Sequence, residues 1–484
     1  MSSISELKPN ALWQFFDQIC AIPHPSYHEQ ALIDWVVSWA NEQGLDVQLD
    51  EVSNVIIRKP ATAGMEDREG VILQAHLDMV PQANSDTQHD FTSDPIRPYI
   101  DGEWVTAEGT TLGADNGIGA ASILAVLASD DIAHGPLEAL LTINEEAGMD
   151  GAFGLKPGLL EGKLLLNTDS EQEGEVYMGC AGGGDTNVTF AADYIDASDA
   201  ASFELVIKGL KGGHSGCDIH TGRANANKLL ARLLAKLQQT NGLSLATIEG
   251  GSLRNAIPRE AKAQIQLADV TAAKALLDSE IAAITAEYAR VEDTLSIELL
   301  ESAAPAQVMS PAMSDKLIAS LNACINGVIS MSQDIEGVVE TSLNVGVIRA
   351  DETGNIKLQI LVRSLVDSGR LMVESSLASL FKLAGAEVDH SGAYPGWKPD
   401  PNSALKTVIE QSYQQLFDKH PNTMVIHAGL ECGLFKAAYP EWDMASFGPT
   451  IKFPHSPDEK VNIASVEKYW ELMKAVLANT PTKG

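Results

Sequence analysis

The sequence predicts an α/β protein in which a mainly parallel sheet domain is interrupted by an inserted α+β domain. Three observations lead to this fold class. Strand-like and helix-like segments alternate up to residue 180, as in a sheet covered by helices. Beyond the glycine-rich run CAGGGD (180–185) the order changes to β-α-β-β-α-β. Beyond YPGWKPDPN (394–402), a second run rich in proline and glycine, the first pattern resumes.

The first region is predicted to contain two amphipathic helices followed by buried strands. Leu12, Phe15 and Ile19 recur at helical spacing, and apolar residues do so again over 32–40. A further helix is predicted over 117–128, between the first two strands. The strands are the apolar runs 71–75, 137–143, 164–166 and 176–178.

The middle region is predicted to hold two β-α-β-β-α-β units in tandem. The segments alone allow either three consecutive domains or one domain with an insertion. The predicted strands lie at 203–207, 243–249, 261–267, 295–300, 341–349, 356–363 and 387–389, and the helices at 224–237, 271–290, 312–325 and 370–384.

The composition is that of a folded protein with more than one domain. The chain has 484 residues, of which 45% are hydrophobic and 20% charged. It carries 33 basic and 66 acidic residues, a formal net charge of −33. A surface with this much negative charge repels phosphate backbones and anionic lipids. We therefore expect neither a nucleic-acid nor a membrane partner.

The cysteines and the apolar runs indicate the cytoplasm. The 5 cysteines are scattered and include no C-x-x-C pair, which fits free thiols better than a disulfide framework. No secretion signal is visible at the N-terminus. No apolar run reaches the roughly 18 residues that span a bilayer.

Polar side chains follow three of the predicted strands. His76 and Asp78 follow the first strand, Glu145 and Glu146 the second, and Asp169 the third. Ligands collect at the carboxyl ends of strands in open α/β sheets. Acidic residues are rarely buried there unless they are paired or bind a metal. These clusters together predict a metal site.

Two glycine-rich runs lie near candidate site residues. Asp115 lies in LGADNGIGAA (112–121), directly before the predicted helix. This run lacks the third glycine of a dinucleotide loop, and KGGHSG (211–216) lacks the G-K-[ST] ending of a phosphate loop. Neither run therefore indicates nucleotide binding.

The order and spacing of five segments resemble the signature segments of the M20 family of metallopeptidases. The long insert and GGHSG (212–216) are most similar to the aminoacyl-histidine dipeptidase branch of that family. The five segments are HLDMVP (76–81), GADNGIG (113–119), NEEAGMDGA (144–152), NTDS (167–170) and FPHSPDE (453–459).

The resemblance implies two divalent metal ions per subunit. His76 is expected to bind one ion and His455 the other, with Asp115 bridging them and Glu146 and Asp169 completing the two shells. This ligand set suits zinc, with cobalt or manganese as alternatives.

The resemblance also implies the catalytic groups of this region. Asp78 is expected to fix the orientation of the His76 imidazole. Glu145 is expected to act as general base, taking a proton from a water that bridges the metals and passing it to the leaving amine.

His455 selects the insertion over three consecutive domains. It lies about 290 residues beyond Asp169, yet must reach the same pair of metals. We therefore predict a discontinuous catalytic domain formed by 1–184 plus 393–484. The inserted domain, 185–392, is expected to act as a lid and to form a homodimer.

Further candidates come from the insert and from the segment HAGLECG (427–433). By resemblance, His214 stabilises the oxyanion, in the active site of the partner subunit, and Asn255 and Arg363 bind substrate. The guanidinium of Arg363 suits a terminal carboxylate, although an ion pair at a strand edge explains it almost as well. Glu431 is a candidate for binding the substrate amino group or, equally, for supporting a glycine turn.

The leading hypothesis is hydrolysis of dipeptides, preferentially Xaa-His. An N-acyl amino-acid deacylase or a carboxypeptidase of the same fold is the alternative, because every metal ligand is shared. A non-catalytic metal-binding protein is disfavoured by the presence of Glu145. A phosphoesterase is disfavoured by the scarcity of Arg and Lys near the motifs.

Overall fold

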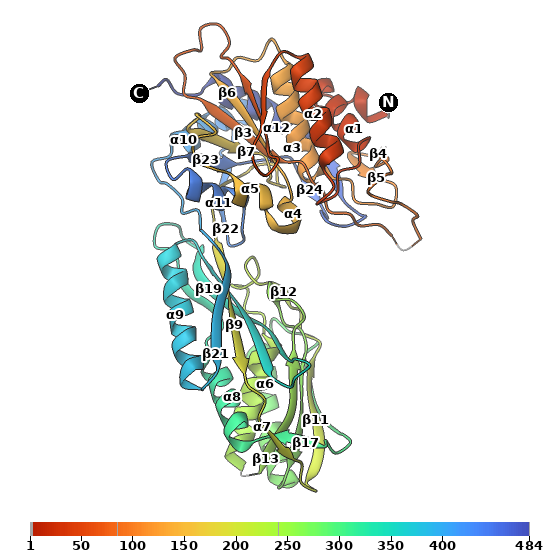
Figure 1. Cartoon of the computed structure of the whole chain (residues 1–484), viewed down its shortest axis with the longest axis vertical. Coiled ribbons are helices and arrows are strands. Elements are labelled where there is room, and N and C mark those ends of the chain that lie inside the picture. The colour runs from red at the N-terminus through yellow and green to blue at the C-terminus, as the bar shows by residue number, and fades with distance from the viewer. Residues whose placement is uncertain (1–2, 85, 241, 484) are drawn as a thin grey trace. The chain divides into compact units, whose positions relative to one another are not determined.

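The chain folds into two compact units, which are described separately (Figure 1). The computed structural model describes residues 3–84, 86–240 and 242–483. Unit 1 comprises Met1–Gly179, Trp397–Val425 and Leu430–Gly484, and unit 2 comprises Cys180–Gly396 and Ile426–Gly429.

The short segment Ile426–Gly429 groups with unit 2, although the sequence placed all of 393–484 with the first domain. One backbone and one side-chain contact explain this grouping. The N–H of Ala181 donates to the carbonyl of Ile426 (3.0 Å), and His427 Nε2 lies 2.8 Å from the hydroxyl of Ser342.

The sheet of unit 1 is parallel at its centre and antiparallel towards its edges. Strand β3 (Val71–His76) pairs in parallel with β6 (Leu137–Thr142) and β7 (Leu164–Asn167), and β7 pairs in parallel with β23 (Asp443–Ser446). The strand order is β1-β2-β6-β3-β7-β23-β8-β22. The outer strands are β1 (Asp46–Leu49), β2 (Val55–Lys59), β8 (Glu175–Cys180) and β22 (Asn422–Ile426).

Apolar helices form the core of unit 1 with this sheet. In α1 (Asn10–Cys20), Leu12 and Ile19 are buried, as their helical spacing predicts, and so is Phe16, whereas Phe15 is half-buried. Helix α3 (Ala114–Ala128) is buried over almost its whole length, because it is apolar on every side. The other helices are η1 (Ser3–Glu6), α2 (Gln30–Glu42), α4 (Glu145–Gly148), α5 (Asp150–Gly154), α10 (Ala404–Phe417), α11 (Glu431–Ala438) and α12 (Ile463–Ala478).

A small antiparallel sheet holds the loop that contains His455. The loop 453–459 connects β24 (Ile451–Lys452) to β25 (Lys460–Asn462), and these two strands pair with each other. Strand β25 also pairs with β5 (Trp104–Ala107), which pairs with β4 (Pro98–Asp101). His455 is therefore carried on a hairpin whose ends are fixed by the small sheet.

Unit 2 is built on one large sheet rather than on two separate tandem units. The sheet order is β16-β11-β15-β13-β19-β20-β9-β21, and β18 also pairs with β19. The two predicted halves join where Gly250 of β13 pairs with Ile348 of β19. The helices α6 and α9 pack on the sheet, as Figure 1 shows.

The helices of unit 2 begin and end close to the predicted residues. They are α6 (Ala226–Leu237), η2 (Gln238–Thr240), α7 (Val270–Tyr288), α8 (Pro311–Ala323) and α9 (Asp367–Leu383). The strands are β9 (Gly182–Phe190), β10 (Tyr194–Asp196), β11 (Ala201–Lys208), β12 (Gly213–His214), β13 (Leu243–Gly250), β14 (Ala256–Ile257), β15 (Ala261–Leu267), β16 (Ser296–Glu301), β17 (Gln307–Met309), β18 (Gly327–Met331), β19 (Val339–Ala350), β20 (Ile356–Ser364) and β21 (Glu387–Tyr394).

The glycine-rich run 180–185, which marks the change of element order in the sequence, leads directly into strand β9. The glycines serve close packing. A Cβ on Gly182 would lie 2.4 Å from the backbone nitrogen of Gly396, and a Cβ on Gly184 would lie 2.3 Å from Glu374 Oε1. Glycine in a strand interior often marks such a close approach, which a turn-based interpretation misses.

Among the described residues, no helix has the length and apolar character needed to cross a bilayer.

Candidate active site

The five predicted metal ligands lie together at the carboxyl edge of the parallel strands in unit 1. His76 is the last residue of β3, and Glu146 and Asp169 follow β6 and β7 at the same edge. Asp115 precedes the regular part of α3, and its φ and ψ of −85° and 105° are not helical. The peptide bond between Asp115 and Asn116 is cis.

Asp115 divides its two carboxylate oxygens between two groups of ligands. Its Oδ1 lies 3.2 Å from His76 Nε2, which in turn lies 3.3 Å from Asp169 Oδ1. Its Oδ2 lies 3.2 Å from His455 Nε2, which lies 3.0 Å from Glu146 Oε1. The geometry is therefore that of two three-residue groups that share one carboxylate.

These distances fit two divalent cations. Ligand atoms placed about 2.0 Å from a tetrahedral zinc ion lie about 3.3 Å from one another. Glu146 Oε1 is buried and makes no well-directed hydrogen bond, although His455 Nε2 lies 3.0 Å away. Two imidazoles and three carboxylates facing common points in this way suit zinc, cobalt or manganese.

The carboxylates around the two histidines favour positive charge in this pocket. Burial lowers the pKa of His76, but Asp169, Asp115 and Asp78 raise it more, so its pKa lies well above the usual value. The carboxylates of Asp115 and Glu146 raise the pKa of His455 to about 11. Without a bound cation, protons on the histidines balance the carboxylates, and a divalent cation would displace them.

Asp78 contacts His76 mainly through its backbone carbonyl. The Nδ1 atom of His76 donates to the backbone carbonyl of Asp78 (2.9 Å), whereas the Asp78 carboxylate is 3.4 Å away. That carboxylate accepts hydrogen bonds from the backbone N–H groups of Glu145 (2.9 Å) and Glu146 (3.2 Å) and from Ser26 (2.7 Å). Asp78 thus orients both the imidazole and the first turn of α4.

Glu145 lies next to a predicted ligand but is not within ion-pair distance of either histidine, among the residues that the structure describes. Burial, with a further contribution from Asp169, raises the pKa of its carboxyl well above the ordinary value. A carboxyl group placed beside metal ligands and outside their shells is suited to proton transfer.

Glu431 lies beneath the carboxyl edge of the sheet, fully buried. Its Oε2 accepts hydrogen bonds from Gln74 (2.6 Å) and Thr142 (2.9 Å), while its Oε1 has no hydrogen-bond partner among the described residues. Burial raises the pKa of Glu431 to about 8. Its role in binding the substrate amino group stays a prediction.

Unit 2 brings His214 and Arg363 together. His214 Nδ1 accepts hydrogen bonds from the backbone N–H groups of Gly216 (3.2 Å) and Cys217 (3.0 Å). Burial and the neighbouring Arg363 lower the pKa of His214 to about 4. The imidazole is therefore neutral at pH 7, with its proton on Nε2, and Nε2 lies 3.4 Å from Arg363 Nη2. Two donors that face each other in this way fit a shared anionic acceptor.

Arg363 is buried and interacts with the charge of Asp185, but forms no ion pair among the described residues. It is 5% exposed, and its guanidinium donates to the hydroxyls of Ser215 (3.3 Å) and Tyr394 (3.1 Å). Within the described part of the chain, no carboxylate lies within 4.0 Å of it. A buried unpaired cation is unfavourable, which argues against the strand-edge ion pair and favours a ligand that carries a carboxylate.

Asn255 lies beside this pair of donors. Its side chain is exposed, and its backbone carbonyl accepts a hydrogen bond from Ser215 N–H (2.9 Å). The short pairing of β12 with β14, which includes His214 and Ala256, holds the two loops together.

The sequence interpretation missed two side chains near Arg363. Tyr394 contacts its guanidinium, and His427 is buried close to it. Burial, followed by the charge of Arg363, lowers the pKa of His427 to about 3. The only available signal was that Tyr394 and His427 lie in the glycine-containing runs 394–402 and 427–433.

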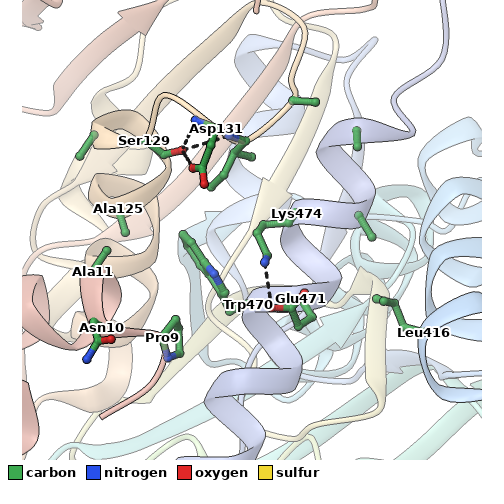
Figure 2. A pocket seen from close by; sticks show the side chains of 15 residues that line it. Pro9, Asn10, Ala11, Ala125, Ser129, Asp131, Leu416, Trp470, Glu471 and Lys474 are labelled. Carbon is green, nitrogen blue, oxygen red and sulfur yellow. Dashed lines mark hydrogen bonds and ion pairs between the residues drawn. The ribbon is translucent and has the colours of Figure 1, made fainter. Parts of the chain in front are cut away.

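A separate groove of about 660 Å³ on unit 1 contains none of the predicted site residues (Figure 2). Alanines and Trp470 form much of its surface. Its charged side chains are already satisfied, since Lys474 lies 2.8 Å from Glu471 and Asp131 accepts a hydrogen bond from Ser129 (2.9 Å). The groove therefore offers no competing catalytic cluster.

The chain is similar to known proteins over its whole length. Residues 72–479 match the profile of peptidase family M20/M25/M40. The chain is 56% identical over 488 aligned residues to the cytosol non-specific dipeptidase of Escherichia coli (strain K12), and the alignment covers 100% of both proteins.

Solved structures are similar over the whole chain. The aminoacylhistidine dipeptidase of Vibrio alginolyticus is 58% identical, with a TM-score of 0.94 and coverage of 100% of this chain and 99% of that one. The aminopeptidase PepT of Bacillus cereus ATCC 10987 is 16% identical, with a TM-score of 0.58 and coverage of 98% and 99%, and shows the fold alone. The chain therefore belongs to peptidase family M20/M25/M40 and is a metal-dependent hydrolase that cleaves peptide bonds.

Proposed function

We propose that the chain is a two-metal dipeptidase that hydrolyses dipeptides and prefers Xaa-His. The observation that carries this proposal is the division of the Asp115 carboxylate between His76 and His455. The names of the two similar proteins support a dipeptidase over an N-acyl amino-acid deacylase or a carboxypeptidase. We propose zinc in both positions, with cobalt or manganese as substitutes.

The residues of unit 1 would carry out proton transfer. Two bound ions would lower the pKa of the attacking water and polarise the scissile carbonyl. Glu145 takes the proton of that water and then donates it to the leaving amine. Asp78 keeps Glu145 in place through its hydrogen bond to the Glu145 backbone. No covalent intermediate is needed.

The residues of unit 2 would bind the charged groups of the substrate. His214 presents a neutral Nε2–H donor, which suits the oxyanion of the tetrahedral intermediate. Arg363, which is buried and has no ion-pair partner among the described residues, binds the terminal carboxylate of the dipeptide, with Asn255 nearby. Glu431 is the proposed acceptor for the amino group.

Arg363→Ala is expected to lower kcat/KM for Xaa-His dipeptides by about 10- to 150-fold, which corresponds to the loss of a charge-assisted hydrogen bond worth about 1.5–3 kcal/mol. Cleavage of a C-terminally amidated dipeptide should fall much less, because that substrate has no carboxylate to bind. Steady-state kinetics with both substrates, and with N-acylated amino acids, measure the difference.

Three outcomes of this comparison decide between the hypotheses. Equal cleavage of acid and amide by the wild type contradicts carboxylate recognition by Arg363. A preference for N-acylated amino acids over free dipeptides supports the deacylase alternative. A dipeptide panel that varies the second residue shows whether histidine is preferred, since the similar Escherichia coli protein is named non-specific.

We also propose a cytoplasmic homodimer that forms through unit 2. Strand β18 pairs with β19 alone among the described residues and carries exposed apolar side chains. Val328 and Met331 of β18 expose 36% and 45% of their surface, and Ile325, two residues before the strand, exposes 53%. An edge strand with such side chains is suited to an interface between subunits.

Val328→Lys combined with Met331→Lys is expected to produce a monomer, because lysine on an edge strand opposes association. Light scattering should give about twice the 51.6 kDa chain mass for the wild type and the chain mass itself for the variant. Leu383→Lys is the matched control, because Leu383 is also exposed on unit 2 but lies at the end of α9. A monomeric wild type, or a monomeric control, contradicts an interface at β18.

A further inference from the structure

Glu459 binds the turn that contains Asp115 through four backbone hydrogen bonds. Its Oε2 accepts from the N–H groups of Leu112 (2.8 Å) and Gly113 (3.0 Å). Its Oε1 accepts from those of Ala114 (2.8 Å) and Asp115 (3.2 Å). The carboxylate is 2% exposed, so these four donors replace the water that it has lost.

The turn is shaped to present these four donors to one carboxylate. Gly113 has a φ of +70°, a conformation that favours glycine, and its N–H points to the same oxygen as that of Leu112. The regular part of α3 begins directly after this turn. A carboxylate at this place also interacts favourably with the positive end of the helix dipole.

Glu459 lies at the end of the loop 453–459, which also carries His455. The carbonyl of Glu459 accepts a hydrogen bond from Thr106 of β5 (2.7 Å), so its backbone is fixed by the small sheet. One residue therefore ties together two segments that are 340 residues apart in the chain, one with the shared carboxylate and one with the second imidazole.

We propose that Glu459 is a positioning residue that sets the location of Asp115 relative to His455 and thereby the affinity for both metal ions. This inference rests on the proposed two-metal site. Among the described residues, the contacts of Glu459 are with the backbone of the turn and with Thr106, so it acts through the backbone of Asp115 and through the hairpin of His455. Because Asp115 belongs to both groups of ligands, a shift of its turn disturbs both ions.

Glu459→Gln tests this role. The glutamine oxygen can still accept hydrogen bonds from two of the four N–H groups. Its amide N–H₂ is itself a donor, so it cannot accept from the other two N–H groups and repels them. Loss of such outer contacts typically weakens metal affinity about 10- to 100-fold. We expect this loss for both ions, with two ions still bound at saturation. We also expect excess Co²⁺ to restore turnover, because Glu459 has no part in proton transfer.

Glu138→Gln is the matched control. Glu138 is also a buried carboxylate that binds backbone, accepting from the N–H groups of Glu161 (2.8 Å) and Gly162 (2.7 Å). It lies near the start of β6, whereas the metal ligands lie at the carboxyl end of the parallel strands. This variant should lower the melting temperature but leave the metal affinity within about twofold of that of the wild type, since it removes no outer contact of a ligand.

The experiment titrates chelator-stripped protein with Zn²⁺ against a competing chromophoric chelator and records the melting temperature of each variant. If Glu459→Gln binds Zn²⁺ as tightly as the wild type and only its melting temperature falls, as in Glu138→Gln, then Glu459 has a structural role and does not set the metal affinity. If Glu459→Gln does not fold, Glu459→Asp carries the test, since it keeps the charge but is one methylene too short to reach all four donors. Binding of a single Zn²⁺ by the wild type would contradict the two-metal site. In that case, comparing the affinity of the wild type and of Glu459→Gln for that one ion still decides the role of Glu459.

Discussion

Glu145→Gln is expected to keep both metal ions and to lose at least 10²- to 10⁴-fold in kcat, the usual contribution of a general acid–base group. The amide cannot accept the proton of the attacking water. Glu145 and glutamine have nearly the same shape, and the hydrogen bond that positions Glu145 comes from its backbone to Asp78, so the substitution leaves the turn intact. Steady-state kinetics together with metal analysis measure the two effects separately.

Metal content decides how a loss of activity in this variant is interpreted. A variant with two ions, an unchanged melting temperature and little turnover identifies Glu145 as the base. A variant with near-normal kcat and both ions would contradict this assignment. Loss of an ion in Glu145→Gln would instead place Glu145 in a metal shell and make Glu146 the candidate base.

Asp115→Asn is expected to weaken both ions and to abolish most activity. The amide offers only one oxygen, whereas the carboxylate faces His76 with one oxygen and His455 with the other. The change also removes the negative charge that the two groups of ligands share. Zinc titration of chelator-stripped protein should show both binding steps weakened.

His455→Ala provides the comparison for the bridging role of Asp115. His455 belongs to one group of ligands only, together with Glu146, so its loss should weaken one ion and spare the other. If Asp115→Asn also loses a single ion, Asp115 is a ligand of one site and not a bridge.

The positions of the predicted ligands could be inferred because each follows a strong local signal. His76, Glu146 and Asp169 come directly after apolar runs that form parallel strands, and such strands end at one edge of a sheet. The spacing of the runs sufficed for this inference, and no contact between distant segments had to be known. The role of each ligand came from the family resemblance.

The parts of the site that were not predicted depend on contacts between a side chain and a distant backbone. The Asp78 carboxylate accepts hydrogen bonds from the backbone N–H groups of Glu145 and Glu146, and Glu459 accepts them from the turn before α3. Residue type and spacing predict neither of these contacts. A backbone donor carries no sequence signal. Such supporting carboxylates therefore become visible only when the tertiary structure brings the segments together.

The fold of unit 2 was only partly predictable for a related reason. The helices and most strands follow from the periodicity of the sequence. No local sequence pattern indicates that two similar sets of strands join into one sheet. Pairing between Gly250 and Ile348 makes that junction, and it depends on the register of strands far apart in sequence. Strand β9 was missed because its first residues, 182–184, are glycines, which resemble a turn.

The most direct test of the account is a crystal structure of the zinc-loaded protein with anomalous data at the zinc edge. We expect two peaks in each subunit, with the Asp115 carboxylate between them. One peak should lie among His76, Asp115 and Asp169, and the other among His455, Asp115 and Glu146. Two ions about 3.5–4 Å apart are the usual arrangement of such a pair. A single peak, or a second peak that Asp115 does not contact, would contradict the two-metal site from which the proposed function is argued.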